Sequence, residues 1–186
     1  MSNARVVLGQ LCRAAEDGRI DLATTAPAEE REVNTMMWAA PPSYGALLAV
    51  HNFIACRREF AGAALRFVVV DEEGFDELNR NLVHGVENAE LSTYHLVGFA
   101  EAGEHAAWCF DITAPDENGE YPVYYFHRDE PRARHRTTGN WENPADAAPD
   151  FPTFQAWFEA MTDAFTAAQP PNWFPYLGQP GLAFTG

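Results

Sequence analysis

Three strand-like runs follow one another between residues 92 and 128, and they constrain the fold more strongly than any other part of the sequence. The runs are STYHLVGFAEAG, HAAWCFDI and EYPVYYFHR, and they are rich in the β-branched and aromatic residues that favour strands. Residues 101–105 and 113–120, which contain turn-forming Gly, Pro, Asp and Asn, separate them. Because short connections join antiparallel neighbours, these runs predict an antiparallel meander.

Helical patterns lie on both sides of this meander. Apolar residues recur at helical spacing over residues 3–16, 43–52, 71–85 and 150–165. The last of these stripes comprises Phe154, Trp157, Phe158, Met161 and Phe165. Either Asp150 or Thr153 can cap that helix. The run LRFVVV at 65–70 predicts a buried strand, and a chain of 186 residues suits one domain.

The stretch SYGALLAVHN at 43–52 predicts a short helix that ends in two polar residues. Its stripe comprises Tyr44, Leu47, Leu48 and His51. Pro42 fits the first helical turn, and Asn52 can end the helix in the left-handed conformation. A catalytic His51 would need a partner that the sequence does not offer, so we expect a structural role for it. Upstream of this helix, we expect Met36, Met37 and Trp38 to pack inward.

The charge of the chain restricts its partners. The formal net charge is −15, and all 12 basic residues are Arg. Such a charge repels nucleic acid and anionic membranes, and it favours encounter with a basic protein. An acidic surface that only maintains solubility would look the same. The absence of Lys excludes Schiff-base and P-loop chemistry that depends on this residue.

Motifs for catalysis and metal binding are absent from the sequence. Cys12, Cys56 and Cys109 form no CxxC pair, so we expect reduced, mostly packed thiols in a cytoplasmic protein. The six His residues show no HxH, HxxxH or HExxH spacing, and no GxSxG or GxGxxG occurs. No apolar run is long enough to span a membrane. We therefore expect no catalytic residue, metal or cofactor, with one alternative, a small enzyme built around His127 and Asp129.

Taken in order, several segments resemble the SUKH superfamily. A proline followed by SYGALLAVHN is similar to the family's proline–tyrosine–leucine–asparagine helix. LVGFAEAGEHAAWCFDI is similar to its central pair of strands, PVYYFHRDEP to its next strand and acidic turn, and FPTFQAWFEAM to its terminal helix. The resemblance covers about residues 35–165. The tail at 166–186 is rich in Pro, Gly and aromatic residues, and we expect it to be an extension packed onto the domain.

The resemblance implies a single domain over residues 1–186 with an α+β fold. In this fold, a mixed or antiparallel sheet of about five to six strands has helices packed around it. The bacterial members of the family are largely immunity proteins, which bind and neutralise a cognate toxin domain, often a nuclease, of a polymorphic toxin system. The resemblance therefore implies a non-enzymatic protein-binding function. A regulatory scaffold, as in the eukaryotic members, is a further alternative.

Residues that contact such a partner are expected in acidic turns and in the aromatic tail. The acidic candidates are Asp71, Glu72, Glu73, Asp76 and Glu77, then Asp116, Glu117 and Glu120, and finally Asp129 and Glu130. Trp173 and Phe174 are the aromatic candidates, because aromatic side chains anchor many interfaces. Each acidic residue is also compatible with a merely solvated surface, so both interpretations stay open.

Overall fold

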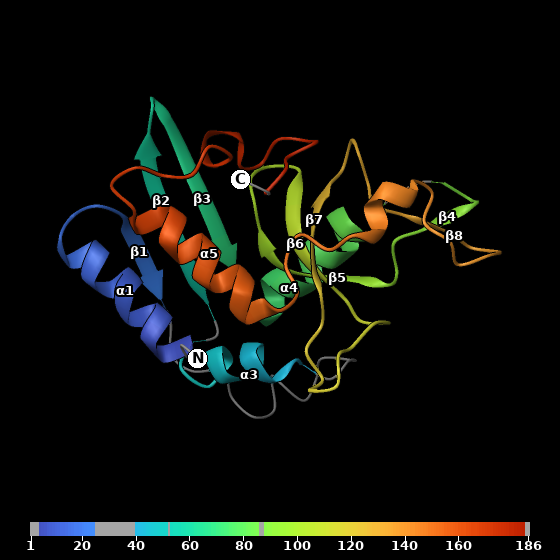
Figure 1. The fold of residues 1–186 in the computed structure, drawn as a ribbon, viewed down its shortest axis with the longest axis horizontal. Coiled ribbons are helices and arrows are strands. Elements are labelled where there is room, and N and C mark those ends of the chain that lie inside the picture. Colours follow the sequence, from blue (N-terminus) through green and yellow to red (C-terminus); the bar gives the residue numbers. More distant parts are fainter. Residues whose placement is uncertain (1–3, 25–39, 52, 86–87, 185–186) are drawn as a thin grey trace.

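A six-stranded antiparallel sheet organises the chain (Figure 1). The computed structural model describes residues 4–24, 40–51, 53–85 and 88–184. Its strands, in the order in which they pair, are β1 (Asp21–Thr24), β2 (Ile54–Phe60), β3 (Ala63–Val69), β5 (Leu96–Glu101), β6 (Ala106–Asp111) and β7 (Val123–His127). The predicted meander is confirmed as β5, β6 and β7. The α+β fold is likewise confirmed.

In the described part of the chain, three helices cover one face of this sheet. They are α1 (Ala4–Glu16), α3 (Pro42–Leu48) and α5 (Phe154–Thr166) (Figure 1). The predicted stripe of α5 is fully buried in the main core, where Trp157 meets Phe67 and Phe99 edge-on. The pattern predicted this correctly because its apolar residues repeat with the helical period.

The opposite face carries a second, smaller core. Helix α4 (Glu72–Leu78) continues directly into a π-helical turn, η1 (Asn79–Val83). Leu78 and Val83 from this segment pack with Cys109 and Phe126 of the sheet. Trp141 from the segment 128–150 packs against the same cluster. That segment also contains β8 (Arg134–His135), which pairs with β4 (Leu91–Ser92), and the 3₁₀ turn η2 (Pro144–Ala147).

The ends of α5 are held by specific polar contacts. The Thr153 hydroxyl accepts a hydrogen bond from the Ala156 N–H at 3.2 Å, so Thr153, and not Asp150, is the N-cap. At the other end, the Arg58 guanidinium donates to the carbonyl oxygens of residues 164, 165 and 167. A cation at this end satisfies free carbonyls and opposes the helix dipole.

The helix predicted at 43–52 is shorter than its pattern indicated. It begins at Pro42, as expected, and ends at Leu48. The N–H groups of Val50 and His51 both donate to the Leu47 carbonyl, and the chain then turns towards β2. His51 therefore lies beyond the helix and is only half-buried, which corrects its predicted place on the helical stripe. Asn52, Met36, Met37 and Trp38 lie outside the described residues.

The aromatic tail packs onto the body of the domain as expected. Phe174, at the start of the 3₁₀ turn η3 (Phe174–Tyr176), is fully buried between Phe165 and Phe60. Phe184 lies against the rings of Trp108 and Trp173. Within the described residues, no helix has the length and apolar character needed to cross a bilayer.

Candidate partner-binding surface

The acidic residues around α4 are divided between structural and surface roles. Asp71 is the N-cap of the helix, and its Oδ1 accepts the Gly74 N–H at 3.0 Å. Glu72 is the first residue of the helix. Asp76 forms an exposed ion pair with Arg80, with 3.8 Å between Oδ2 and Nη2. Glu73 and Glu77 are exposed. Glu73 and Glu77 thus belong neither to the helix cap nor to the Asp76–Arg80 ion pair.

The acidic turn at 113–120 mainly supports the fold. The Asp116 carboxylate accepts the N–H groups of Glu120 and Asn118, and these bonds hold its pKa below the usual range. The half-buried Glu120 accepts the Ser43 N–H at 2.7 Å and the Ser43 hydroxyl at 2.6 Å. Glu120 therefore holds the first turn of α3, and Glu117 remains exposed.

Asp129 and Glu130 line a concavity of about 400 Å³ beside the edge strand β7. We call this concavity the acidic recess. Its lining residues are Tyr125, His127, Asp129, Glu130, Pro131, Arg132, Glu142, Asn143, Asp146, Gly181 and Leu182. They come from β7, the segment 128–150 and the tail. The structure thus combines the predicted acidic pair with Glu142 and Asp146, which the sequence did not single out.

The acidic side chains of the recess influence one another. Burial raises the pKa of Asp146, Glu142 and Glu130 raise it further, and Arg132 opposes them. Arg132, the cation of the described lining, is already bound to Asp150, with 2.9 Å between Nη1 and Oδ2. Both partners of this ion pair are largely buried. The recess therefore keeps a strongly negative character.

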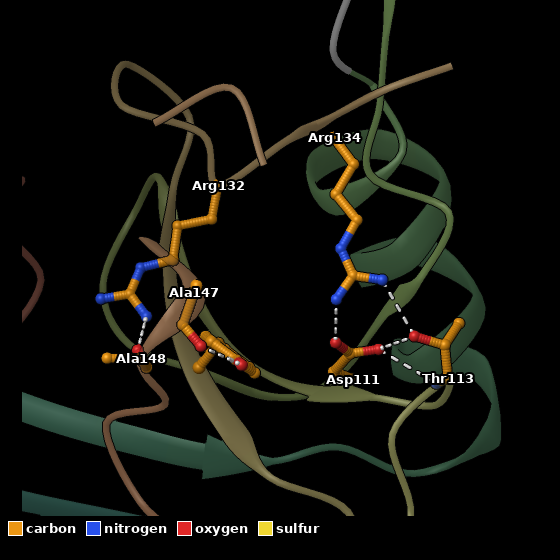
Figure 2. A network of polar contacts seen from close by, with 7 residues as sticks. Asp111, Thr113, Arg132, Arg134, Ala147 and Ala148 are labelled. Carbon is orange, nitrogen blue, oxygen red and sulfur yellow. Dashed lines mark hydrogen bonds and ion pairs between the residues drawn. The ribbon is translucent and has the colours of Figure 1, made fainter. Parts of the chain in front are cut away.

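Two arginine networks hold the segment that forms the recess (Figure 2). The Arg134 guanidinium donates to Asp111 at 2.6 Å and to the Thr113 hydroxyl at 3.0 Å, and it lies 4.3 Å from the centre of the Trp141 ring. Arg132 also donates to the Ala148 carbonyl at 3.4 Å. The Tyr124 hydroxyl of β7 donates to the Ala147 carbonyl at 3.1 Å, which attaches the last residue of η2, next to Asp146, to the sheet (Figure 2).

The Asp150 carboxylate has a second role at the edge of the sheet. Its Oδ2 accepts the outward N–H of Tyr125 at 2.6 Å, and burial raises the pKa of the carboxyl group. The backbone of Phe151 also pairs with Val123. An edge strand covered in this way does not offer free backbone groups for pairing with another strand. A partner is therefore expected to use side chains of this edge.

His127 is the recess residue that carries the enzymatic alternative. It is 6% exposed, and its Nδ1 accepts the Asp129 N–H at 3.1 Å. A neutral ring in this arrangement carries its proton on Nε2, so its single acceptor nitrogen is occupied. In the described part of the chain, no three His, Cys, Asp or Glu side chains are grouped so that they could hold a metal ion.

A second concavity of about 370 Å³ lies in the tail and shares Gly181 and Leu182 with the acidic recess. We call it the aromatic groove. Trp173 and Tyr176 form part of its lining, and Tyr176 is 56% exposed. The predicted anchor Phe174 does not reach this surface, because its ring is fully buried in the core. Tyr176 takes its place as the accessible aromatic residue.

The cysteines lie as expected for packed thiols, with one exception. Cys109 and Cys56 are buried, and burial raises the pKa of both thiols, that of Cys56 to about 12. Cys12 is exposed on α1. A thiol in an apolar environment is a poor nucleophile, because the thiolate is disfavoured there. Cys109 is therefore a core residue, as predicted.

A comparison with protein-family models and a search of curated proteins each give no match to this chain. The geometry of the recess is therefore the main guide to function. Glu142 and Asp146 lie 12 or more residues after Glu130, and a fold is needed to bring them together. The one sequence signal near them is Asn143-Pro144, a helix-start pattern in which the Asn143 side chain accepts the Ala145 N–H.

Proposed function

We propose that this chain is a non-enzymatic protein-binding domain that captures a basic partner through the acidic recess. The observation that carries the proposal is the grouping of Asp129, Glu130, Glu142 and Asp146 around one concavity, beside an arginine already neutralised by Asp150. A concave, negatively charged site with rigid walls focuses its field on an approaching cation.

We further propose, on the resemblance to the SUKH superfamily, that the partner is a bacterial toxin domain and that the chain is its immunity protein. Nucleases are often basic because they bind a polyanion, and a net charge of −15 accelerates their capture. Inhibition inside the producing cell would place this function in the cytoplasm. A regulatory scaffold would use the same surface without neutralising an activity.

A small enzyme centred on His127 is the second candidate, because this residue lines the recess beside several carboxylates. The Asp129 N–H bound to Nδ1 argues against His127 as a general base, since a base needs a free acceptor nitrogen. Of the two functions, the recess geometry therefore favours binding.

The proposal is tested with the protein encoded by the neighbouring gene. We expect co-expression of this chain to protect a bacterial host from that protein, and the purified pair to associate more slowly as salt increases. Failure to protect, together with failure to form a complex at low ionic strength, would refute the function. Protection that persists in His127→Ala would exclude the enzymatic alternative.

A further inference from the structure

We propose that the acidic recess and the aromatic groove form one docking surface, and that this surface takes an arginine side chain from an extended segment of the partner protein. The guanidinium enters the recess, and the residues flanking it lie on Trp173 and Tyr176. This inference rests on the proposed function and specifies the chemistry of its partner.

The two concavities are continuous along the tail. Gly181 and Leu182 line both of them, so a segment that leaves the recess passes directly onto the aromatic side chains. The volumes of the two concavities are about 400 and 370 Å³. Concavities of this size accommodate an inserted side chain and its flanking residues, whereas a flat partner surface would leave them unfilled. Exposed aromatic residues next to a charged pocket are typical anchors of protein interfaces.

The recess suits an organic cation better than a metal ion. Its carboxylates raise the pKa of Asp146, but the described side chains do not group closely enough to chelate a metal. A guanidinium has five N–H donors spread over a plane, so it can serve several separated acceptors at once. Lysine concentrates its charge at one point and matches such a set less well.

Tyr125 belongs to the lining of the recess, but its hydroxyl is buried and not part of the accessible wall. It lines the recess, yet it is only 5% exposed. Its hydroxyl lies near the Gly178 N–H, but it meets hydrogen-bond geometry with no described group. The hydroxyl is therefore not a contact for the incoming guanidinium, which is bound by the carboxylates of the recess.

The chain already binds one of its own guanidinium groups with a carboxylate and an aromatic ring. Arg134 places its guanidinium on the Asp111 carboxylate at 2.6 Å and over the Trp141 ring at 4.3 Å. A carboxylate next to an aromatic face binds arginine strongly, because charge-assisted hydrogen bonds and stacking of the guanidinium act together. The docking surface offers carboxylates in the recess to the guanidinium and aromatic rings in the adjoining groove to the residues that flank it.

The test uses three blocked pentapeptides that are identical except at the centre, which is Arg, Lys or citrulline. Citrulline keeps the shape of arginine and removes its charge. Titrations of the ¹⁵N-labelled protein at low ionic strength, followed by NMR, give both the affinity and the contacted residues. We expect the arginine peptide to shift signals of residues 127–132, 142–146 and 173–182. We expect it to bind at least about tenfold more tightly than the citrulline peptide, with lysine in between.

Two double variants with the same change of charge separate the recess from the general acidity of the chain. Glu142→Gln/Asp146→Asn removes two charges from the recess, and Glu73→Gln/Glu77→Gln removes two from exposed positions on α4. We expect the first variant to weaken the arginine peptide about tenfold and the second to change it less than twofold. Tyr176→Ser, at an exposed position, is expected to weaken it several-fold and provides a test that does not depend on the recess acids.

Equal weakening by both double variants, or equal binding of the arginine and citrulline peptides, would overturn the inference. So would the absence of any shift at peptide concentrations of about 1 mM, which corresponds to a binding free energy of only about −4 kcal/mol. A neighbouring-gene toxin that still binds the recess variant with unchanged affinity would also refute the arginine site, and the proposed function would stand. Arginine-peptide binding without any toxin binding would support the arginine site and refute the proposed function.

Discussion

The side-chain amide of Asn79 pairs with the backbone of Gly98 through two hydrogen bonds of 2.8 Å, one in each direction. Asn79 opens the π-helical turn η1, and Gly98 lies where the register between β5 and β6 shifts. At this bulge, the side chain replaces the strand neighbour that the Gly98 peptide would otherwise have. The close approach requires glycine, because a Cβ at this position would lie 2.9 Å from Cγ2 of Val83.

Replacement of Asn79 by Ala should therefore destabilise the domain strongly. The change leaves the N–H and C=O of Gly98 without partners in a buried environment, and each such group costs about 1–3 kcal/mol. We expect the free energy of unfolding, measured by urea denaturation, to fall by about 2–4 kcal/mol. Asn81→Ala, an exposed site in the same turn, should change it by less than about 0.5 kcal/mol. Equal effects at the two positions would contradict this role.

The elements that the sequence predicted well are those whose signal is local. The stripe of α5 and the β-branched and aromatic composition of β5, β6 and β7 are properties of neighbouring residues, so they are visible without a fold. Strand β2 was not predicted, because Arg57, Arg58 and Glu59 interrupt its apolar pattern. In the structure, Arg57 pairs with Glu59 on the solvent side, and Arg58 reaches the end of α5. The partner of a charged side chain is set by tertiary structure, which local patterns do not contain.

The same limit applies to the candidate site. The sequence predicts Asp129 and Glu130 as candidates because they form an acidic pair after a strand, whereas Glu142 and Asp146 join them only through the folding of the segment 128–150. The sequence offers Asp150 and Thr153 as possible caps of α5, and in the structure Asp150 instead binds Arg132 and the edge of β7. The acidic residues in the sequence thus predict a negatively charged surface. Its position in the fold depends on the contacts of Arg132 and Arg134, which the sequence does not reveal.

Arg134 and Asp111 should stabilise the domain as a pair, so the effect of replacing one of them depends on whether the other is present. The Asp111 side chain is 1% exposed, so Arg134→Met leaves an uncompensated charge inside the protein. We expect this change to lower the free energy of unfolding by about 2–4 kcal/mol. Adding Asp111→Asn to that variant should recover part of the loss, because the buried charge is then removed.

A double-mutant cycle measures this coupling by urea denaturation of the four proteins. Arg80→Met is the matched control, because Arg80 pairs with Asp76 on the surface at 3.8 Å. Exposed pairs of this kind contribute only about 0–1 kcal/mol. Additive effects of the Arg134 and Asp111 substitutions would show that the two side chains are not energetically linked.

Phe174 should be a core residue of the domain and not a binding residue. Its ring is fully buried against Phe165, with their centres 4.9 Å apart, and lies near Arg58. Phe174→Ala should lower the free energy of unfolding by about 3–5 kcal/mol, because it removes apolar contacts and leaves a cavity. Tyr176→Ala, at an exposed position two residues away, should cost less than about 1 kcal/mol. Thermal and urea unfolding of the two variants check this contrast, and similar losses would refute it.

His95 should make the stability of the domain depend on pH. Its pKa is lowered from 6.5 to about 4, mainly by burial and also by Arg134 and His84, while Asp111 opposes the shift. Its ring meets that of Trp141 edge-on, with 4.9 Å between the ring centres. Between pH 6.5 and about 4, the unfolded chain binds a proton at this residue and the folded protein does not. His95 therefore costs no stability above pH 6.5, and its cost grows as the pH falls towards 4.

We expect this contribution to reach about 2–3 kcal/mol at pH 4, since one pKa unit corresponds to about 1.4 kcal/mol. Urea denaturation across this range compares the protein with His95→Phe, which cannot take up the proton at this position. The difference in unfolding free energy should be constant above pH 6.5 and shift in favour of the variant below it. His105→Phe, at an exposed position, is the control for loss of a histidine as such. A difference between the protein and His95→Phe that does not change with pH would show that His95 is not held neutral by its surroundings.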